Sequence, residues 1–296
     1  MKPIQIELAG RFKFTAVNVN DGTERELTPW FDNLILDAGL NKIAEQGIGT
    51  HCSVGTGSTA PANGQTALVG LVYQTDNQTG TTTGYDSSGN LYAWVRRKFR
   101  FTPGQATGNL SEVGIGWNSG LFSRALIKDG AGDPTTITVL SDEYLDVTYE
   151  LRTYRPAADS TYNVTISGVT YSVTSRAAMM SSWDASTFLN FGASYVGNTF
   201  METFGTGGLG AVTGSPSGAQ IANGMYAAFD GAYSTNSRER NIKFTAGLSQ
   251  SNADIYAIQF YTELGRYQMS FTPPLPKTSE KMLTLNAKLS WARKTI

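Results

Sequence analysis

The sequence has one cysteine, one histidine and few charged residues. Because Cys52 has no second cysteine to pair with, an intramolecular disulfide is excluded. A zinc or copper site usually needs several His or Cys ligands, and a nucleophile–histidine–acid triad would have to use His51. Adjacent residues of a strand point to opposite faces, so His51 and Cys52 are poorly placed to share a proton. We therefore expect no catalytic residue, no metal site and no cofactor.

Charged residues make up 16% of the 296 residues, whereas about 25% is usual. The net charge is −1, so the chain as a whole does not attract nucleic acid. Gly, Ser, Thr and Asn supply the polar bulk instead, a composition that favours strands joined by tight turns. It also suits a surface that is partly covered by other subunits, because the centres of interfaces are poor in Lys, Glu and Asp. We therefore expect a homo-oligomer with no direct nucleic-acid partner.

A basic cluster at residues 96–100 is the local exception. It comprises Arg96-Arg97-Lys98 and Arg100, which alternate with Trp94, Phe99 and Phe101. This alternation is typical of a strand with one polar face. We expect that face to be solvated or salt-bridged.

Sequence motifs for catalysis are missing as well. Neither the phosphate-cradling GxxxxGK[ST] pattern nor a GxSxG elbow is present. A glycosidase needs only two carboxylates across a cleft, so a glycan hydrolase stays an alternative. The acids considered for such a pair are Asp37, Glu112, Asp142, Glu143, Asp146 and Asp184.

Long apolar runs are missing too. No stretch reaches the roughly 18 to 20 apolar residues of a transmembrane helix, and residues 1–14 show no signal-peptide pattern. We therefore expect no membrane insertion and a protein made in a cytoplasm.

What the sequence does contain is alternating apolar and polar residues over much of its length, which predicts a mainly β fold. We expect two β-sandwich-like domains, at 1–156 and 157–296, with long Gly-rich loops. One short helix is predicted at about 35–46, capped by Asp32-Asn33 and ended by Gly47 and Gly49. The phrase Phe-Thr-Pro recurs at 101–103 and 271–273, so a duplicated β domain is an alternative.

Two polar, glycine-rich segments, 79–90 and 205–224, are predicted to be loops. Residues 205–224 have few apolar anchors. We therefore hypothesise that they are ordered only by contact with a neighbouring subunit.

Several phrases taken together resemble a family of tailed-bacteriophage virion proteins of the tail, neck collar or tail-fibre type. The phrases are FDNLILDAGL (31–40), CSVGTGSTAP (52–61), EVGIGW (112–117) with LFSRALI (121–127), and residues 134–140 with LDVTYELR (145–152). The resemblance covers residues 28–155, and the ending from FTPP (271–274) to WAR (291–293) also fits; residues 157–265 show none.

The resemblance implies a structural component of the virion, in the neck, collar or tail, which assembles with itself and with other phage neck or tail proteins. It carries over no catalytic residue. The alternative is a tail protein that binds a host-surface glycan through Trp or Tyr side chains.

Overall fold

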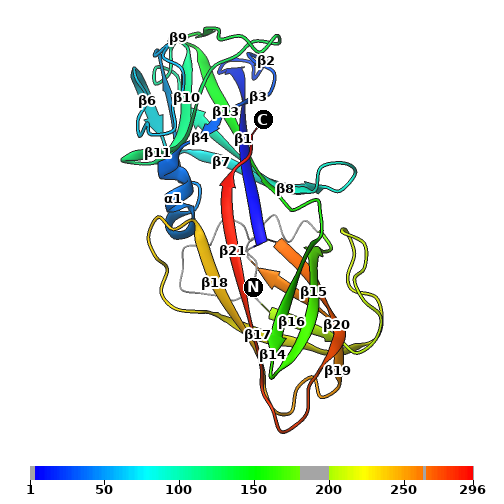
Figure 1. Ribbon diagram of the computed structural model, residues 1–296. Helices are drawn as coiled ribbons and strands as arrows, with labels where there is room; N and C mark the ends of the chain where they lie inside the picture. The colour runs from blue at the N-terminus through cyan, green and yellow to red at the C-terminus, as the bar shows by residue number, and fades with distance from the viewer. Residues whose placement is uncertain (1–3, 181–199, 263–264, 296) are drawn as a thin grey trace. The chain divides into compact units, whose positions relative to one another are not determined.

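The computed structural model describes residues 4–180, 200–262 and 265–295 (Figure 1). Strands account for 56% of the residues and helices for 4%, which confirms the prediction of a mainly β fold with one short helix. The chain forms two compact units, neither of which is one continuous stretch of sequence. The first unit comprises residues 1–7, 85–93 and 153–292, and the second comprises 8–84, 94–152 and 293–296. The division into an N-terminal β domain at 1–156 and a C-terminal β-rich domain at 157–296 stays a prediction.

The second unit is built from two facing sheets, a separate two-stranded sheet of β9 and β12, and one helix. One sheet has the strand order β4-β11-β10-β5-β6, and in the other the strands run β1-β13-β8-β7, with β2 and β3 paired to β1. Its elements are β1 (Ile4–Asn18), β2 (Glu24–Glu26), β3 (Phe31–Asp32), β4 (Leu34–Ile35), α1 (Asp37–Gln46), β5 (His51–Gly55), β6 (Leu71–Thr75), β7 (Gln78–Asp86), β8 (Tyr92–Phe101), β9 (Gly108–Leu110), β10 (Glu112–Trp117), β11 (Gly120–Leu126), β12 (Ile137–Val139) and β13 (Glu143–Tyr154). β1, β7, β8 and β13 have most of their residues in this unit.

Aromatic side chains connect the two sheets of the second unit. The rings of Phe122 on β11 and Tyr149 on β13 lie 6.5 Å apart, edge to face, and Tyr149 also contacts Phe12 on β1 at 4.9 Å. Tyr73 on β6 approaches Phe101 on β8 at 6.4 Å. Since Phe122 and Tyr149 are buried and come from opposite sheets, the unit is sandwich-like, with its core between the sheets.

The helix α1 begins two residues later than predicted, because Leu34–Ile35 form β4 against β11. Its N-cap is Leu36, which makes no side-chain capping bond, so the predicted cap at Asp32-Asn33 is wrong. The end is as predicted, since Gly47 has a φ of 61° and its N–H bonds to the carbonyl of Ile43.

Gly39 explains how closely α1 approaches the sheet. A Cβ at this position would lie 2.2 Å from the backbone oxygen of Phe122 on β11. The glycine therefore permits close helix–strand packing.

The first unit is one long sheet. Its strands are β14 (Ser160–Ile166), β15 (Val169–Ala177), β16 (Phe200–Phe204), β17 (Gln220–Phe229), β18 (Glu239–Ala246), β19 (Asp254–Thr262), β20 (Gly265–Pro276) and β21 (Leu283–Arg293). They are arranged in the order β14-β15-β20-β19-β16-β17-β18-β21. Phe244 on β18 contacts Phe260 on β19 at 5.5 Å, although β16 and β17 separate these strands in the sheet. The sheet must therefore curl around its own core.

Two predicted loops contain strands. Residues 78–86 form β7, which pairs with β8, so the prediction of a loop at 79–90 is wrong for most of its length. Its threonines favour an extended backbone, and pairing with β8 satisfies that backbone even though few of its side chains are buried. Similarly, β17 begins at Gln220, inside the predicted loop 205–224. The two Phe-Thr-Pro phrases occupy different places, since 101–103 ends β8 whereas 271–273 lies within β20.

The remaining loop, residues 205–219, is held by a buried glutamine. The side-chain amide of Gln268, which is fully buried, donates to the carbonyls of Ala177 at 3.0 Å and Ala211 at 2.8 Å. Its oxygen accepts a bond from the N–H of Gly210 at 2.7 Å. These bonds hold residues 205–219 within the chain itself, so contact with a neighbouring subunit is not needed to explain their order.

Replacing Gly39 with alanine should destabilise the second unit. The added Cβ would clash with backbone, which cannot rotate away, so we expect a loss of about 1–3 kcal/mol in the free energy of unfolding. Urea denaturation measures it. Gly130→Ala is the matched control because nothing lies within 4 Å of its Cβ position; equal stability of the two variants would contradict the proposed close packing.

Replacing Gln268 with leucine should release residues 205–219. The substitution leaves two carbonyls and one N–H without their partner, at a cost of about 1–3 kcal/mol each if they stay buried. Limited proteolysis should therefore cut Gln268→Leu within 205–219 several times faster than the native chain or the control Gln5→Leu, whose side chain is exposed. Equally fast cleavage of the native chain would restore the neighbouring-subunit hypothesis.

Candidate functional site

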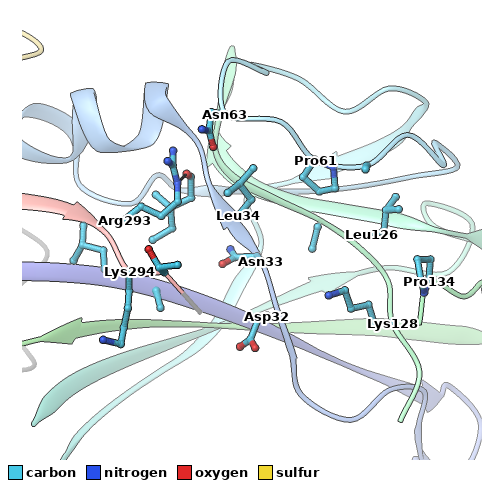
Figure 2. Close-up of a pocket in the computed structure, with 16 residues that line it drawn as sticks. Asp32, Asn33, Leu34, Pro61, Asn63, Leu126, Lys128, Pro134, Arg293 and Lys294 are labelled. Carbon is cyan, nitrogen blue, oxygen red and sulfur yellow. Dashed lines mark hydrogen bonds between the residues drawn. The ribbon is translucent and has the colours of Figure 1, made fainter. Parts of the chain in front are cut away.

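One pocket of the second unit has a lining that serves the scaffold. Its volume is about 730 Å³, and Figure 2 shows Asp32, Asn33 and Lys128 around its middle. Arg293 lies on its wall but is already engaged, since its guanidinium donates to the carbonyl of Ile35 at 2.5 Å and to the carboxylate of Asp37 at 3.1 Å. The lining residues are Leu8, Ala9, Asp32, Asn33, Leu34, Ile35, Ala60, Pro61, Asn63, Ala125, Leu126, Lys128, Pro134, Arg293, Lys294 and Thr295. With one carboxylate and no Cys or His among them, this lining offers no acid–base pair.

A second hollow, the basic groove, lies over β7, β8 and β13. Its volume is about 400 Å³, within the usual range of small-molecule sites. The basic groove is lined by Thr79, Gly80, Thr81, Thr82, Arg96, Lys98, Arg100 and Thr148. Alternation along β8 brings the three cations to one face, as predicted, whereas Arg97 points to the other face and donates to the carbonyl of Gly49.

Two buried carboxylates on β13 hold the cations of the groove. Asp146 accepts two bonds of 2.7 Å from Arg100 and one of 3.2 Å from Lys98. Glu150 accepts from Arg96 at 2.5 Å, from Arg152 at 2.6 Å and from Arg11 at 2.8 and 3.1 Å. Both carboxylates are fully buried, whereas the side chains of Arg96, Lys98 and Arg100 are 35%, 42% and 31% exposed. The predicted salt-bridged strand face is therefore confirmed.

The electrostatics of this network keep Glu150 ionised. Burial alone would raise the pKa of Glu150, but the bonds from Arg11, Arg152 and Arg96 outweigh it and hold the pKa below its ordinary value. Bonding to Asp146 raises the pKa of Arg100. A general acid needs a raised carboxyl pKa, so Glu150 is unsuited to that role.

Aromatic rings support the same guanidinium groups. Arg96 lies over the rings of Trp94 and Trp30, at 4.1 and 5.2 Å, and Arg100 lies over Tyr144 at 4.9 Å. The indole of Trp94 in turn packs where Gly84 of β7 has no side chain, since a Cβ there would lie 2.3 Å from it. These stacked positions limit the motion of the cations.

An apolar edge strand is the other unusual surface of this unit. Among the strands that the structure describes, β6 is the last of its sheet and pairs only with β5. Leu71 and Val72, adjacent residues that point to opposite faces, are 59% and 42% exposed, with Val69 at 56% just before them. Residues 46–75 contain no Asp, Glu, Lys or Arg. We call Val69, Leu71, Val72 and Tyr73 the apolar edge.

A buried ion pair positions that edge. The side chains of Glu112 on β10 and Arg124 on β11 are fully buried and bond at 2.7 and 2.9 Å. Glu112 also accepts from the backbone N–H groups of Gly57, Val69 and Gly70 at 2.9, 3.2 and 2.6 Å. The carboxylate thus fixes the chain on both sides of the loop that leads into β6.

Gly57 lies directly beside this carboxylate. A Cβ on Gly57 would lie 2.4 Å from the Glu112 carboxylate. The residue is glycine because a buried anion occupies the space beside it.

The two residues considered for thiol–imidazole chemistry lie in β5, and they do not form such a pair. Cys52 is fully buried, and burial raises the pKa of its thiol, so no thiolate is available at neutral pH. The Nδ1 atom of His51 lies 2.9 Å from the hydroxyl of Thr50 instead.

The acids considered for a hydrolase pair are held by other groups. Besides Glu112 and Asp146, Asp142 accepts a bond from Asn18 at 3.0 Å and Glu143 pairs with Arg25 at 2.9 Å. These four and Asp37 serve as structural bond acceptors, and Asp184 lies outside the described residues. Within residues 4–180, 200–262 and 265–295, no group of three His, Cys, Asp or Glu side chains could hold a metal ion. No helix in this described part is long and apolar enough to cross a membrane.

Comparisons with protein-family models, with curated proteins and with solved structures found no match to this chain. The two candidate surfaces are therefore interpreted from their own geometry.

Sequence reasoning found the basic strand but missed the apolar edge and the buried pair. The uncharged run 46–75 was a visible signal for the edge. The pairing of Glu112 with Arg124 had no comparable signal, because their contact depends on the register of β10 and β11.

Glu112→Gln should destabilise the protein by about 3–5 kcal/mol at neutral pH, because Arg124 would keep a buried charge without its anion. Burial alone would raise the pKa of Glu112. The bonds from Gly70, Arg124 and Val69 outweigh the effect of burial and hold this pKa below its ordinary value of 4.5. Because the folded pKa is the lower one, the stabilisation is present above 4.5 and is lost as the pH falls below it.

Urea denaturation from pH 7 to pH 3 tests this expectation. Native stability should fall more steeply at the acid end than that of Glu112→Gln. The control is Glu26→Gln, whose side chain is 57% exposed. Parallel pH profiles for the native chain and Glu112→Gln would show that the pair is not the cause.

Proposed function

We propose that this protein is a non-enzymatic structural component of a tailed-bacteriophage virion, in the neck, collar or tail. It assembles with copies of itself and with neighbouring virion proteins after synthesis in the host cytoplasm. The phage assignment rests on the resemblance of residues 28–155. Two of its phrases, 112–117 and 121–127, contain the buried pair Glu112 and Arg124, and a third, 52–61, contains Gly57, whose N–H bonds to Glu112. These phrases therefore meet at one structural feature, which supports a scaffold in common with that family.

The apolar edge is the observation that carries the assembly proposal. An unpaired strand edge offers backbone N–H and C=O groups to any other strand, and proteins usually protect it with Lys, Pro or a covering element. β6 lacks charge, and its exposed apolar side chains lie on both of its faces. Exposed apolar side chains on an unprotected edge strand are typical of a strand that pairs with another chain.

A second copy of this chain is the occupant that we propose for the edge. Antiparallel pairing of two β6 strands across a two-fold axis would place the two ends of the strand opposite each other, so that each residue i faces a residue j and j faces i. Such pairing suits a strand without charges. The net charge of −1 gives little repulsion between copies. Pairing would also remove Val69, Leu71 and Val72 from water.

Leu71→Lys/Val72→Lys should convert the oligomer to a monomer, because two charges would face each other across the strand pair. Light scattering over a concentration series measures the mass. The control Met282→Lys adds charge at an apolar side chain that is 60% exposed outside this edge; it should keep the native mass.

Two outcomes would contradict the proposal. A native chain that is monomeric at every concentration would contradict the proposal that it assembles with itself. If the double variant keeps the native oligomeric mass, the contact between copies does not lie on β6.

A further inference from the structure

The basic groove holds more cations than its buried carboxylates need. Asp146 and Glu150 each accept two bonds from one arginine, Arg100 and Arg11 respectively, and they also accept from Lys98 and Arg96. Arg152 bonds to Glu150 as well, and the charge of the exposed Glu24 acts on Arg100. One two-bond arginine for each carboxylate would satisfy it, so Arg96 and Lys98 are surplus cations.

The surplus cations face the groove with donors to spare. A guanidinium has five N–H donors and a lysine ammonium has three. Arg96 uses its Nε on Glu150, Arg100 uses Nε and Nη2 on Asp146, and Lys98 makes one bond to Asp146. Because the carboxylates lie beneath and the side chains are about one third exposed, the groove presents positive charge to solvent.

The walls of the groove add hydroxyl groups. Thr79, Thr81 and Thr82 of β7 and Thr148 of β13 line it beside the three cations. A hydroxyl both donates and accepts, which suits a ligand that is itself rich in hydroxyls. Nucleic acid fits less well, since its affinity comes from many phosphate contacts along an extended track, roughly 6–10 of them, whereas this groove offers three cations.

We propose that the basic groove binds an anionic saccharide, with Arg96, Lys98 and Arg100 taking its carboxylate, sulfate or phosphate group and the threonines taking its hydroxyls. This goes beyond assembly: it gives the protein a ligand site on the face of β8. The stacked Trp94 and Tyr144 and the buried Asp146 and Glu150 hold the cations in place before the ligand arrives, which lowers the ordering cost of binding.

Arg96→Gln/Lys98→Gln is the test variant. It removes two cations from the groove, and each buried carboxylate still accepts two bonds from one remaining arginine. Glu150 keeps Arg11, and Asp146 keeps Arg100. The matched control, Lys243→Gln/Lys288→Gln, changes the charge equally in the first unit. Calorimetry with the full chain uses polygalacturonate and dextran sulfate oligosaccharides as anionic probes, with neutral dextran and a single-stranded oligonucleotide for comparison.

The native chain should bind at least one anionic oligosaccharide and bind neutral dextran at least tenfold more weakly. Comparing the affinities for polygalacturonate and dextran sulfate distinguishes recognition of a carboxylate from recognition of a sulfate. The groove variant should bind about tenfold or more weakly than the native chain, since a charge-assisted contact contributes on that order, whereas the control should match it. Leu71→Lys/Val72→Lys should also bind normally, which separates this site from assembly.

The proposal is overturned if neutral dextran binds as tightly as the anionic probes, or if neither anionic probe binds. Unchanged affinity of the groove variant would also overturn it. Tighter binding of the oligonucleotide than of either saccharide would replace the ligand class with nucleic acid.

Discussion

The buried Glu112–Arg124 pair is the interaction on which the second unit depends. Two opposite charges without solvent exposure are costly to bury, and that cost is offset only if every remaining donor and acceptor is used. Here the carboxylate takes three backbone N–H groups, and Arg124 donates to the carbonyl of Thr59 and the side chain of Gln65. These partners come from a loop with little apolar anchorage of its own, so the pair gives residues 57–70 their path. Because β6 follows directly, the same pair sets where the apolar edge lies.

Close packing around β10 and β11 explains two glycines. Gly39 brings α1 against Phe122, the neighbour of Ser123 and Arg124 in β11, and Gly57 leaves space for the Glu112 carboxylate. Each is a site where a missing side chain allows a polar or backbone group to approach closely. The two surfaces that we assign to function share this logic: β6 is held by Glu112, and the cations of β8 are held by Asp146 and Glu150. In both, a buried carboxylate fixes an exposed feature.

The sequence predicted what depends on local pattern. Alternation identified β8 and β13, and apolar spacing with Gly47 identified α1, because these signals act within a few residues. It failed where pairing decides the outcome. Residues 79–82 look like a loop until β8 provides hydrogen-bond partners, and residues 205–219 look unanchored until Gln268, about 50 residues further along the chain, bonds to their backbone. The basic strand was visible in the sequence, but the carboxylates beneath it come from β13, whose alignment with β8 no local pattern reveals.

The basic groove shows why charge balance helps to separate scaffold from function. Had Asp146 and Glu150 served only to stabilise the sheet, one bidentate arginine each would have satisfied them, as Arg100 and Arg11 do. Arg96 and Lys98 add positive charge that repels its neighbours on the same strand, and they are partly exposed, where ion pairs contribute little to stability. An anion in the groove would therefore meet cations that still have free N–H donors. A ligand with a negative group would relieve that repulsion, and the fixed positions of the guanidinium groups would make its binding selective for anionic saccharides over neutral ones.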